Sequence, residues 1–352
     1  MKIASIVGAR PQFIKCAPLS RELRTEHEEI LIHTGQHYDH EMSDIFFEEL
    51  NIPKPDYNLG IGSGNQGEQT GKMLIEIEKV FLKEKPEMVL VYGDTNSTLA
   101  GGLAASKLHI KLAHVEAGLR SFDRRMPEEI NRILSDQVSD LLLCPTQTAI
   151  DNLGKEGITE GVHLVGDVMM DALEYNWKVA REKSRILEEL ELEKGKYVVI
   201  TVHRPGNTDS KDSMSNIIEA LGQSGKITVF PVHPRTMKYM REYGIWDNIP
   251  SNVKLIQPVG YLDMLRLMGD AEKILTDSGG IQKEAYMLEV PCITLRMNTE
   301  WVETLGDGWN VLVGADSKKI VKALNEFKPR DRKKDIFGNG FACEKIREII
   351  NN

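Results

Sequence analysis

The sequence has few cysteines, and no two of them form a C-x-x-C pair: Cys16, Cys144, Cys292 and Cys343. Such sparse and scattered cysteines argue against a disulfide framework and against a cysteine-based zinc site. We interpret them as small buried side chains with reduced thiols. This interpretation predicts a cytoplasmic protein.

Long apolar runs are also missing. No stretch of about 18 apolar residues occurs, and no basic-then-apolar leader precedes the first strand-like run, Ile3–Val7. The sequence therefore predicts neither a membrane-spanning helix nor a secretion signal.

Positive charge is in deficit, with 44 Lys and Arg residues against 53 Asp and Glu and a net charge of −9. This balance argues against binding of nucleic acid or an anionic membrane, because both need a broad basic face. A small phosphorylated molecule needs only a local cluster of cations and backbone N–H groups. That class of ligand stays open.

What the sequence does contain is a series of short β-branched runs separated by amphipathic stretches. This pattern predicts an α/β fold with doubly wound parallel sheets, and 352 residues favour two domains. Six runs lie in each half: Lys2–Val7, Glu29–His33, Met88–Tyr92, Lys111–Val115, Leu141–Cys144 and Val162–Val165, then Tyr197–Val202, Ile227–Val232, Val253–Ile256, Lys273–Thr276, Pro291–Leu295 and Asn310–Val313.

A highly charged, helical stretch at 171–196 predicts the connection between an N-terminal domain, 1–170, and a C-terminal domain, 197–330. The remaining segment, 331–352, ends in an amphipathic helix. In open parallel sheets, ligands bind outside the carboxyl ends of the strands. Two such edges facing each other predict a cleft between the domains.

The segment Asp277-Ser278-Gly279-Gly280 follows a strand and opens a helix. Glycines allow close approach of a ligand, and a helix N-terminus presents free N–H groups to an anion. Glu284 lies just inside this helix, within reach of a ribose. The alternative is a plain helix start whose glycines serve packing.

Cations follow two other strands. Arg10 and Lys15 lie about a turn and a half apart in a helix that opens at Pro11, so both could reach a ligand. His203 and Arg204 follow the strand YVVITV. A solvated helix start is the alternative for the first pair.

Three carboxylates, Asp94, Glu116 and Glu128, lie at strand ends or a helix start, where neighbouring charges can tune them for acid–base work. For Glu128 the alternative is strong, because acids after a proline are favoured in any first helical turn.

Two further patterns are weak. Gly62–Gly67 matches G-x-G-x-x-G without a clear preceding strand, which argues against a dinucleotide site. His33, His37 and His40, with Asp39 and Glu41, lack a recognised metal-ligand spacing, so no metal is predicted.

End to end, the chain resembles the non-hydrolysing UDP-N-acetylglucosamine 2-epimerase family. The motifs that carry the resemblance occur in order: GARPQFIK (8–15), HTGQHYD (33–39), YGDTNSTLAG (92–101), HVEAGLRSFDRRMPEEINR (114–132), PVHPR (231–235), TDSGGIQKEA (276–285) and PCITLR (291–296). The resemblance implies a GT-B-like fold of two Rossmann-like domains, with the last helix returning to the first domain. It also implies a homodimer.

The resemblance assigns site residues by position and implies no redox cofactor and no metal. The implied substrate contacts are Arg10, Lys15, Asp94, Glu116, His203, Gln257, Tyr261, Ser278, Gly279, Gly280, Glu284 and Arg296. The implied catalytic group is Asp94, Glu116, Glu128 and His203. The implied reaction eliminates UDP to a 2-acetamidoglucal, which is reprotonated on its other face as UDP adds back, with domain closure excluding water.

Two departures from the family pattern bear on the substrate. Pro205-Gly206-Asn207 follows the His-Arg pair where Glu-Asn is common, and Thr299-Glu300-Trp301-Val302-Glu303 replaces Thr-Glu-Arg-Pro-Glu. The second feature resembles the branch acting on UDP-2,3-diacetamido-glucuronate, so both substrates stay open. A GT-B glycosyltransferase and a non-catalytic UDP-sugar-binding module are the alternatives from other classes.

Overall fold

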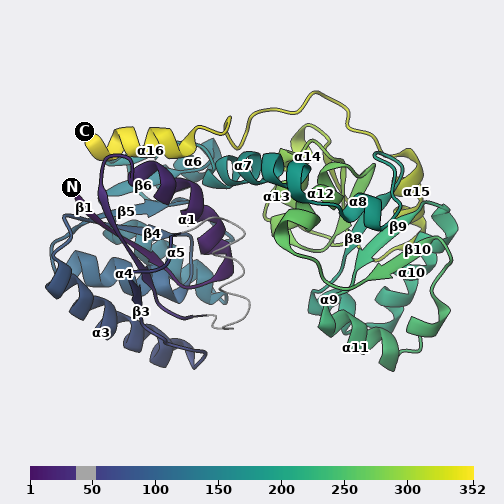
Figure 1. Ribbon diagram of the computed structural model, residues 1–352, viewed down its shortest axis with the longest axis horizontal. Coiled ribbons are helices and arrows are strands. Elements are labelled where there is room, and N and C mark those ends of the chain that lie inside the picture. The colour runs from purple at the N-terminus through teal and green to yellow at the C-terminus, as the bar shows by residue number, and fades with distance from the viewer. Residues whose placement is uncertain (37–52) are drawn as a thin grey trace. The chain divides into compact units, whose positions relative to one another are not determined.

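The computed structural model describes residues 1–36 and 53–352 (Figure 1). The chain forms two compact units: unit 1 comprises Met1–Tyr175 and Asp335–Asn352, and unit 2 comprises Asn176–Lys334. Helices α7 (Val168–Lys183) and α8 (Ile186–Glu189) occupy most of the stretch 171–196, and the boundary between the units falls inside α7.

Unit 1 contains a seven-stranded sheet in the order β3-β2-β1-β4-β5-β6-β7. Every strand pair in its described part is parallel. The strands are β1 (Lys2–Val7), β2 (Glu28–His33), β3 (Tyr57–Asn58), β4 (Met88–Tyr92), β5 (Lys111–Val115), β6 (Leu141–Cys144) and β7 (Val162–Leu164). Six strands were expected here. The prediction missed β3 because a two-residue strand has no detectable alternation.

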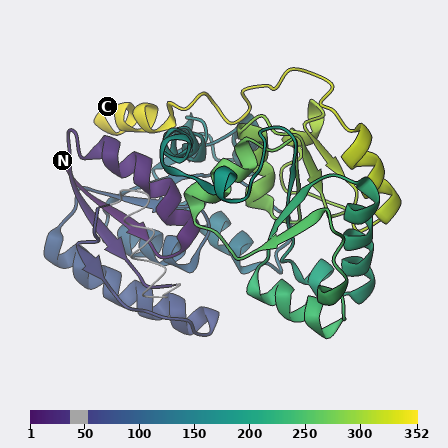
Figure 2. The same ribbon diagram turned by 45° about the vertical axis from the view of Figure 1, so that its right-hand side comes forward.

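Helices cover both faces of this sheet, with α1 (Arg10–Leu23) on one side and α3 (Gln66–Glu84) and α4 (Asn96–Lys107) on the other (Figures 1 and 2). Successive side chains of a strand point to opposite faces. Ile6 of β1 accordingly packs in one cluster with Met73 of α3, whereas Ser5 donates to Glu29, which also bonds Ser20 of α1. Helices α5 (Pro127–Val138) and α6 (Gln147–Lys155) follow β5 and β6.

Unit 2 contains a six-stranded sheet in the order β10-β9-β8-β11-β12-β13, also parallel in every pair. The strands are β8 (Val198–Thr201), β9 (Thr228–Pro231), β10 (Val253–Ile256), β11 (Lys273–Thr276), β12 (Cys292–Thr294) and β13 (Asn310–Leu312). The helices are α9 (Pro205–Thr208), α10 (Lys211–Ser224), α11 (Pro234–Glu242), η1 (Trp246–Asn248), α12 (Tyr261–Gly269), α13 (Gly279–Met287), α14 (Glu303–Gly306) and α15 (Ser317–Glu326).

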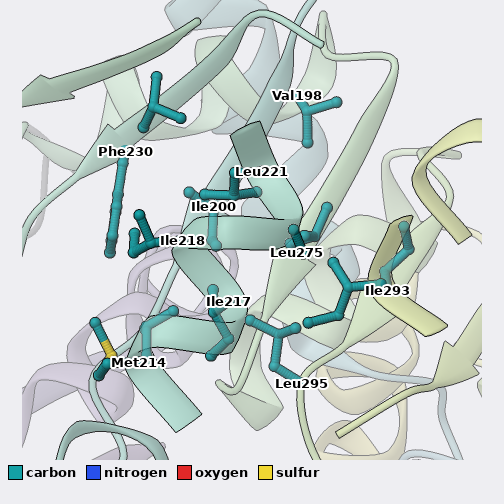
Figure 3. Packing of buried hydrophobic residues seen from close by; sticks show 14 of the residues in the cluster. Val198, Ile200, Met214, Ile217, Ile218, Leu221, Phe230, Leu275, Ile293 and Leu295 are labelled. Atoms are coloured by element: carbon teal, nitrogen blue, oxygen red, sulfur yellow. The ribbon is translucent and has the colours of Figure 1, made fainter. Parts of the chain in front are cut away.

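The core of unit 2 follows from alternation along β8. Val198 and Ile200 face α10, where Ile217 and Leu221 meet them (Figure 3). Tyr197 and Val199 belong to a second cluster on the other face, with residues of α8 and α12. Both sheets are therefore covered on both sides, which confirms the predicted α/β class.

The last helix, α16 (Ala342–Asn351), belongs to unit 1 and lies beside α1 (Figure 2). The Asp171 carboxylate accepts hydrogen bonds from the Ala342 and Cys343 amides at 3.2 and 2.9 Å. Arg347 pairs with Glu22 of α1 at 3.1 Å.

All four cysteines are free and buried. Burial raises the pKa of the Cys144 and Cys292 thiols to about 12, so these groups are neutral side chains of the interior. Among the helices of the described residues, none has the length and apolar character needed to span a bilayer.

Candidate functional site

Each sheet has a point where the connections leave in opposite directions. In unit 1, β1 lies between β2 and β4, and in unit 2, β8 lies between β9 and β11. Ligands of doubly wound sheets bind outside the carboxyl ends of the strands at such points. Ligand-binding residues are therefore expected in the loops after β1, β4 and β5 in unit 1 and after β8 and β11 in unit 2.

In unit 1, Lys15 of α1 forms an ion pair with Glu116, which directly follows β5. Both side chains are largely withdrawn from water, with 13% and 8% exposed. A Cβ atom placed on Gly93 would lie 3.2 Å from Glu116 Oε2 and 3.5 Å from Lys15 Nζ. The loop after β4 therefore lies against this pair, and a side chain at position 93 would require the Glu116 carboxylate to shift by a few tenths of an ångström.

Asp94, the next residue, pairs with Arg132 of α5. Its backbone carbonyl accepts a hydrogen bond from Asn131 Nδ2 at 3.0 Å. About a third of its side chain, 36%, remains exposed. Asp94 thus has a fixed counter-ion and stays open to a ligand, as acid–base work requires.

The two acids at the start of α5 differ sharply. Glu129 is buried and accepts hydrogen bonds from the Ser121 and Phe122 amides, each at 2.9 Å, and from Arg132 at 3.0 Å. These bonds hold its pKa below the usual range despite partial burial. Glu128 is exposed and forms no hydrogen bond or ion pair within the described residues. It lies four residues before Arg132, on the helix face that meets Asp94.

Gln12 is a buried residue that the sequence reasoning did not single out. Its Oε1 accepts hydrogen bonds from the Gly8 and Ala9 amides at 2.8 and 3.1 Å. Its Nε2 donates to the Tyr92 carbonyl at 2.8 Å. Gln12 therefore ties the loop after β1 to the loop after β4. Its place at the third position of a helix, where a glutamine side chain can reach back to the backbone N–H groups before the helix, was a weak signal, because Ala9 at the N-cap cannot complete a capping box.

Arg10 begins α1 directly after the loop, and its side chain lies outside the described residues. His37, Asp39, His40 and Glu41 also lie outside them. His33 is buried, with Nδ1 accepting from the Gly35 amide at 3.0 Å. No metal-binding group of His, Cys, Asp or Glu occurs in the part of the chain that the structure describes. Gly62–Gly67 follows β3, at the sheet edge, and its last two residues begin α3, so the segment lies away from the switch point.

In unit 2, Asp277 organises the loop after β8. Its buried carboxylate accepts hydrogen bonds from the His203 amide at 3.1 Å, the Arg204 amide at 3.0 Å and Asn207 Nδ2 at 3.0 Å. Burial favours the neutral acid, but the His203 ring, whose Nδ1 lies 3.2 Å from Asp277 Oδ1, together with Asn207 and the Arg204 amide, outweighs it and keeps the pKa of Asp277 below its ordinary value. The His203 ring remains 43% exposed.

The start of α13 is an anion-binding arrangement. Ser278 caps the helix, and Gly279 and Gly280 form its first turn. A side chain on Gly279 would collide with the Glu300 carboxylate. That carboxylate pairs with Arg296 at 2.8 Å and lies 3.5 Å from Arg204. An internal anion therefore already lies against this helix start and is matched by two cations.

Of the remaining predicted contacts, the structure brings Tyr261 and Glu284 together, with the phenol donating to Glu284 Oε1 at 3.3 Å. Both are buried, on α12 and α13. Gln257 follows β10 and is exposed. Three residues of these loops were not among the predicted site residues: Arg132, Asp277 and Glu300. The first two lie in the segments 114–132 and 276–285 that carry the family resemblance, and the third lies in 299–303, where the chain departs from the family pattern.

Comparison with known proteins identifies the family. The family model described as UDP-N-acetylglucosamine 2-epimerase matches residues 21–351. The chain is 58% identical to a Methanococcus maripaludis "UDP-N-acetylglucosamine 2-epimerase homolog" over 356 residues, covering 100% of both chains. It is 48% identical to the Pseudomonas aeruginosa UDP-2,3-diacetamido-2,3-dideoxy-D-glucuronate 2-epimerase over 99% of both.

A solved structure agrees. The Methanocaldococcus jannaschii UDP-GlcNAc 2-epimerase in complex with UDP-GlcNAc and UDP superposes with a TM-score of 0.86 at 49% identity, covering 100% of this chain and 99% of that one. The fold is therefore that of the GT-B-like nucleotide-sugar epimerases, and the predicted fold class is confirmed. The chain belongs to the UDP-N-acetylglucosamine 2-epimerase family and is an epimerase by class.

We predict that Gly93→Ala destabilises unit 1 more than Gly60→Ala does. The two glycines have nearly equal positive φ values, 63° and 62°, so each alanine costs about 1 kcal/mol in backbone strain. Only the Cβ at position 93 also crowds the Glu116 carboxylate that pairs with Lys15, because no atom lies within 4 Å of one at position 60. Denaturant unfolding of both variants measures the difference. Equal losses would show that the ion pair moves aside freely.

Proposed function

We propose that the protein is a non-hydrolysing UDP-sugar 2-epimerase that interconverts UDP-N-acetylglucosamine and UDP-N-acetylmannosamine. The observation that carries the proposal is the pair of carboxylates in unit 1: Asp94 and Glu116 lie on adjacent strand-end loops, each held by its own cation. The related Methanocaldococcus jannaschii UDP-GlcNAc 2-epimerase, whose structure holds UDP-GlcNAc and UDP, supports the substrate class.

The chemistry needs groups that move protons and groups that accept a departing diphosphate. Carbon 2 of the sugar has no adjacent carbonyl to acidify its proton. Loss of UDP from carbon 1 creates a cation-like centre that releases the carbon-2 proton and leaves 2-acetamidoglucal. UDP then adds back while a proton arrives on the opposite face. In our proposal Asp94, Glu116 and Glu128 share these proton transfers.

In our proposal, unit 2 binds the diphosphate of the substrate. The α13 start, Ser278–Gly280, offers backbone N–H groups, and His203 and Arg296 offer further donors. Glu284, which accepts a hydrogen bond from the Tyr261 hydroxyl, is the proposed ribose contact. The complete proposed contact set is Arg10, Lys15, Asp94, Glu116, His203, Gln257, Tyr261, Ser278, Gly279, Gly280, Glu284 and Arg296.

A second substrate is favoured by one specific feature. Trp301-Val302, within Thr299–Glu303, departs from the Thr-Glu-Arg-Pro-Glu pattern towards that of the diacetamido-glucuronate branch, and the Pseudomonas aeruginosa relative is 48% identical. The same chemistry on UDP-2,3-diacetamido-2,3-dideoxy-glucuronate is therefore the second candidate. We further propose a cytoplasmic homodimer in which the two units are the two domains, as the family resemblance implies.

Carbon-2 deuteration tests the proposal directly. Each UDP-sugar is incubated separately with the protein in deuterated water, and NMR follows loss of the carbon-2 proton signal. We expect deuterium at carbon 2 of the true substrate, because elimination and re-addition exchange that proton with solvent. Turnover without label would overturn the glucal scheme. A glycosyltransferase would need an acceptor and would leave carbon 2 unlabelled.

We predict that Asp94→Asn lowers carbon-2 exchange by roughly 100-fold or more while UDP affinity stays unchanged, because a proton-transfer group is lost but the diphosphate side is intact. The amide preserves the shape of the carboxylate. Asp151→Asn, an exposed residue of α6, is the matched control. Exchange is measured by NMR and UDP affinity by calorimetry. Turnover that survives the change removes Asp94 from the catalytic group.

We also predict that Glu300→Gln tightens UDP binding by roughly two- to fivefold, the size expected for a half-exposed ion pair. The Glu300 carboxylate competes with a phosphate for Arg296, Arg204 and the α13 start. Uridine, which lacks the diphosphate, should bind unchanged. Glu289→Gln, an exposed acid just past the end of α13, controls for net charge. Weaker UDP binding would show instead that Glu300 orients Arg296 towards the ligand.

A further inference from the structure

His114 is a buried residue of β5 that the proposed reaction does not use directly. Its ring is 0% exposed. Nδ1 lies 2.7 Å from Asp136 Oδ1, and Nε2 lies 2.7 Å from the Gly93 carbonyl oxygen. A carboxylate and a carbonyl are both acceptors, and a neutral imidazole carries only one N–H. Only the doubly protonated ring donates to both partners.

The surroundings supply the charge balance that a buried cation needs. The Asp136 side chain is also 0% exposed, and its Oδ2 lies 2.7 Å from Arg120 Nη1. Arg120 forms a second ion pair with Glu156, with Nη2 2.6 Å from Oε2. Burial alone would lower the pKa of His114, but Asp136 and the Gly93 carbonyl reverse this and raise it. His114 and Arg120 hold the pKa of Asp136 low against its own burial. Charges of opposite sign therefore alternate along the series.

This series ends at the loop that carries Asp94. The Gly93 amide donates to the Val115 carbonyl at 3.0 Å, while its carbonyl accepts from His114, so the peptide is held on both sides. Glu116 also interacts electrostatically with His114. The charged groups around the ring are thus Asp136 of α5, Glu116 after β5 and Arg120 in the next loop, with Lys15 of α1 paired to Glu116.

We propose that His114 is a positioning residue of the epimerase: a buried imidazolium that fixes the Gly93–Asp94 turn and places a constant positive charge beside Glu116. This role rests on the proposed function, because Asp94 and Glu116 are its proton-transfer groups. His114 touches no reacting atom. It acts by holding one carboxylate in place and by favouring the ionised form of the other.

The charge state has a stability consequence whose sign is fixed. A histidine whose pKa is raised by folding stabilises the folded protein fully below its unfolded pKa, about 6.5. The stabilisation is lost as the pH rises through the raised folded value. His114 therefore contributes its full stabilisation below about pH 6.5 and progressively less as the pH rises above that value.

The first experiment measures the charge without using activity. In the full chain with ¹⁵N-labelled histidine, we expect both ring nitrogens of His114 to show the shifts of protonated imidazolium at pH 7.5, well above the ordinary histidine pKa. His114→Gln assigns the signals. Titration of the wild-type ring near pH 6.5 would overturn the proposal.

The second experiment removes the charge and keeps the shape. In Asp136→Asn, a neutral His114 can still donate to Gly93 while Nδ1 accepts from the new amide. We expect kcat for carbon-2 exchange to fall roughly 10- to 100-fold at pH 7.5, with UDP affinity unchanged and activity recovering as the pH is lowered. Asp140→Asn is the control, because Asp140 bonds the Leu112 amide of β5 at 2.8 Å without touching His114.

A kcat for Asp136→Asn within twofold of the wild type would overturn the role of the charge beside Glu116, because a neutral His114 still holds the Gly93–Asp94 turn in that variant. If that variant does not fold, His114→Gln, which keeps a donor without the charge, is judged by the same loss of kcat at constant UDP affinity. If the wild-type protein exchanges carbon 2 of neither UDP-sugar, the proposed function fails. The nitrogen shifts still decide the charge of His114 in that case.

Discussion

Carboxylates withdrawn from water need a cation or several hydrogen-bond donors, and the strand-end loops of both units are organised around this requirement. In unit 1, Lys15 serves Glu116 and Arg132 serves Asp94. In unit 2, two backbone amides and Asn207 serve Asp277. Each of these bonds also fixes a loop, so the interactions that stabilise the carboxylate hold the neighbouring residues in position as well.

The two units differ in the charge that gathers at the carboxyl ends of their strands. Unit 1 gathers the acids Asp94 and Glu116, to which we assign proton transfer, while unit 2 presents a helix start with Arg204 and Arg296 beside it. Both edges exist because every described strand pair is parallel, which brings the carboxyl ends together. A reaction that expels a dianion while shifting a proton needs both kinds of surface.

The sequence predicted the strands well, because β-branched runs bounded by polar residues are a local signal. Met88–Tyr92 and Lys111–Val115 match residue for residue, and so the positions of Asp94 and Glu116 after strands could be predicted. The partners of those acids could not. Arg132 and Lys15 reach them from helices, and which face a helix turns towards the sheet edge depends on packing of the whole unit.

The acids at the start of α5 show the same limit. A first helical turn favours acids for local reasons, so Glu128 and Glu129 look equivalent in sequence. The structure separates them, because Glu129 alone turns inward to the Ser121 and Phe122 amides. Strand β3 shows this limit too. Its two residues are too few to form an alternating pattern, and only their pairing with β2 makes them a strand.

The return of α16 to unit 1 bears on how the protein is made. Every residue of unit 2 leaves the ribosome before the helix that covers α1 does. The α1 surface of unit 1 therefore stays uncovered until α16 has been synthesised, by which time every residue of the unit 2 core is present. The Asp171 and Arg347 contacts therefore complete unit 1, the first part of the chain to be synthesised, with residues that are synthesised last.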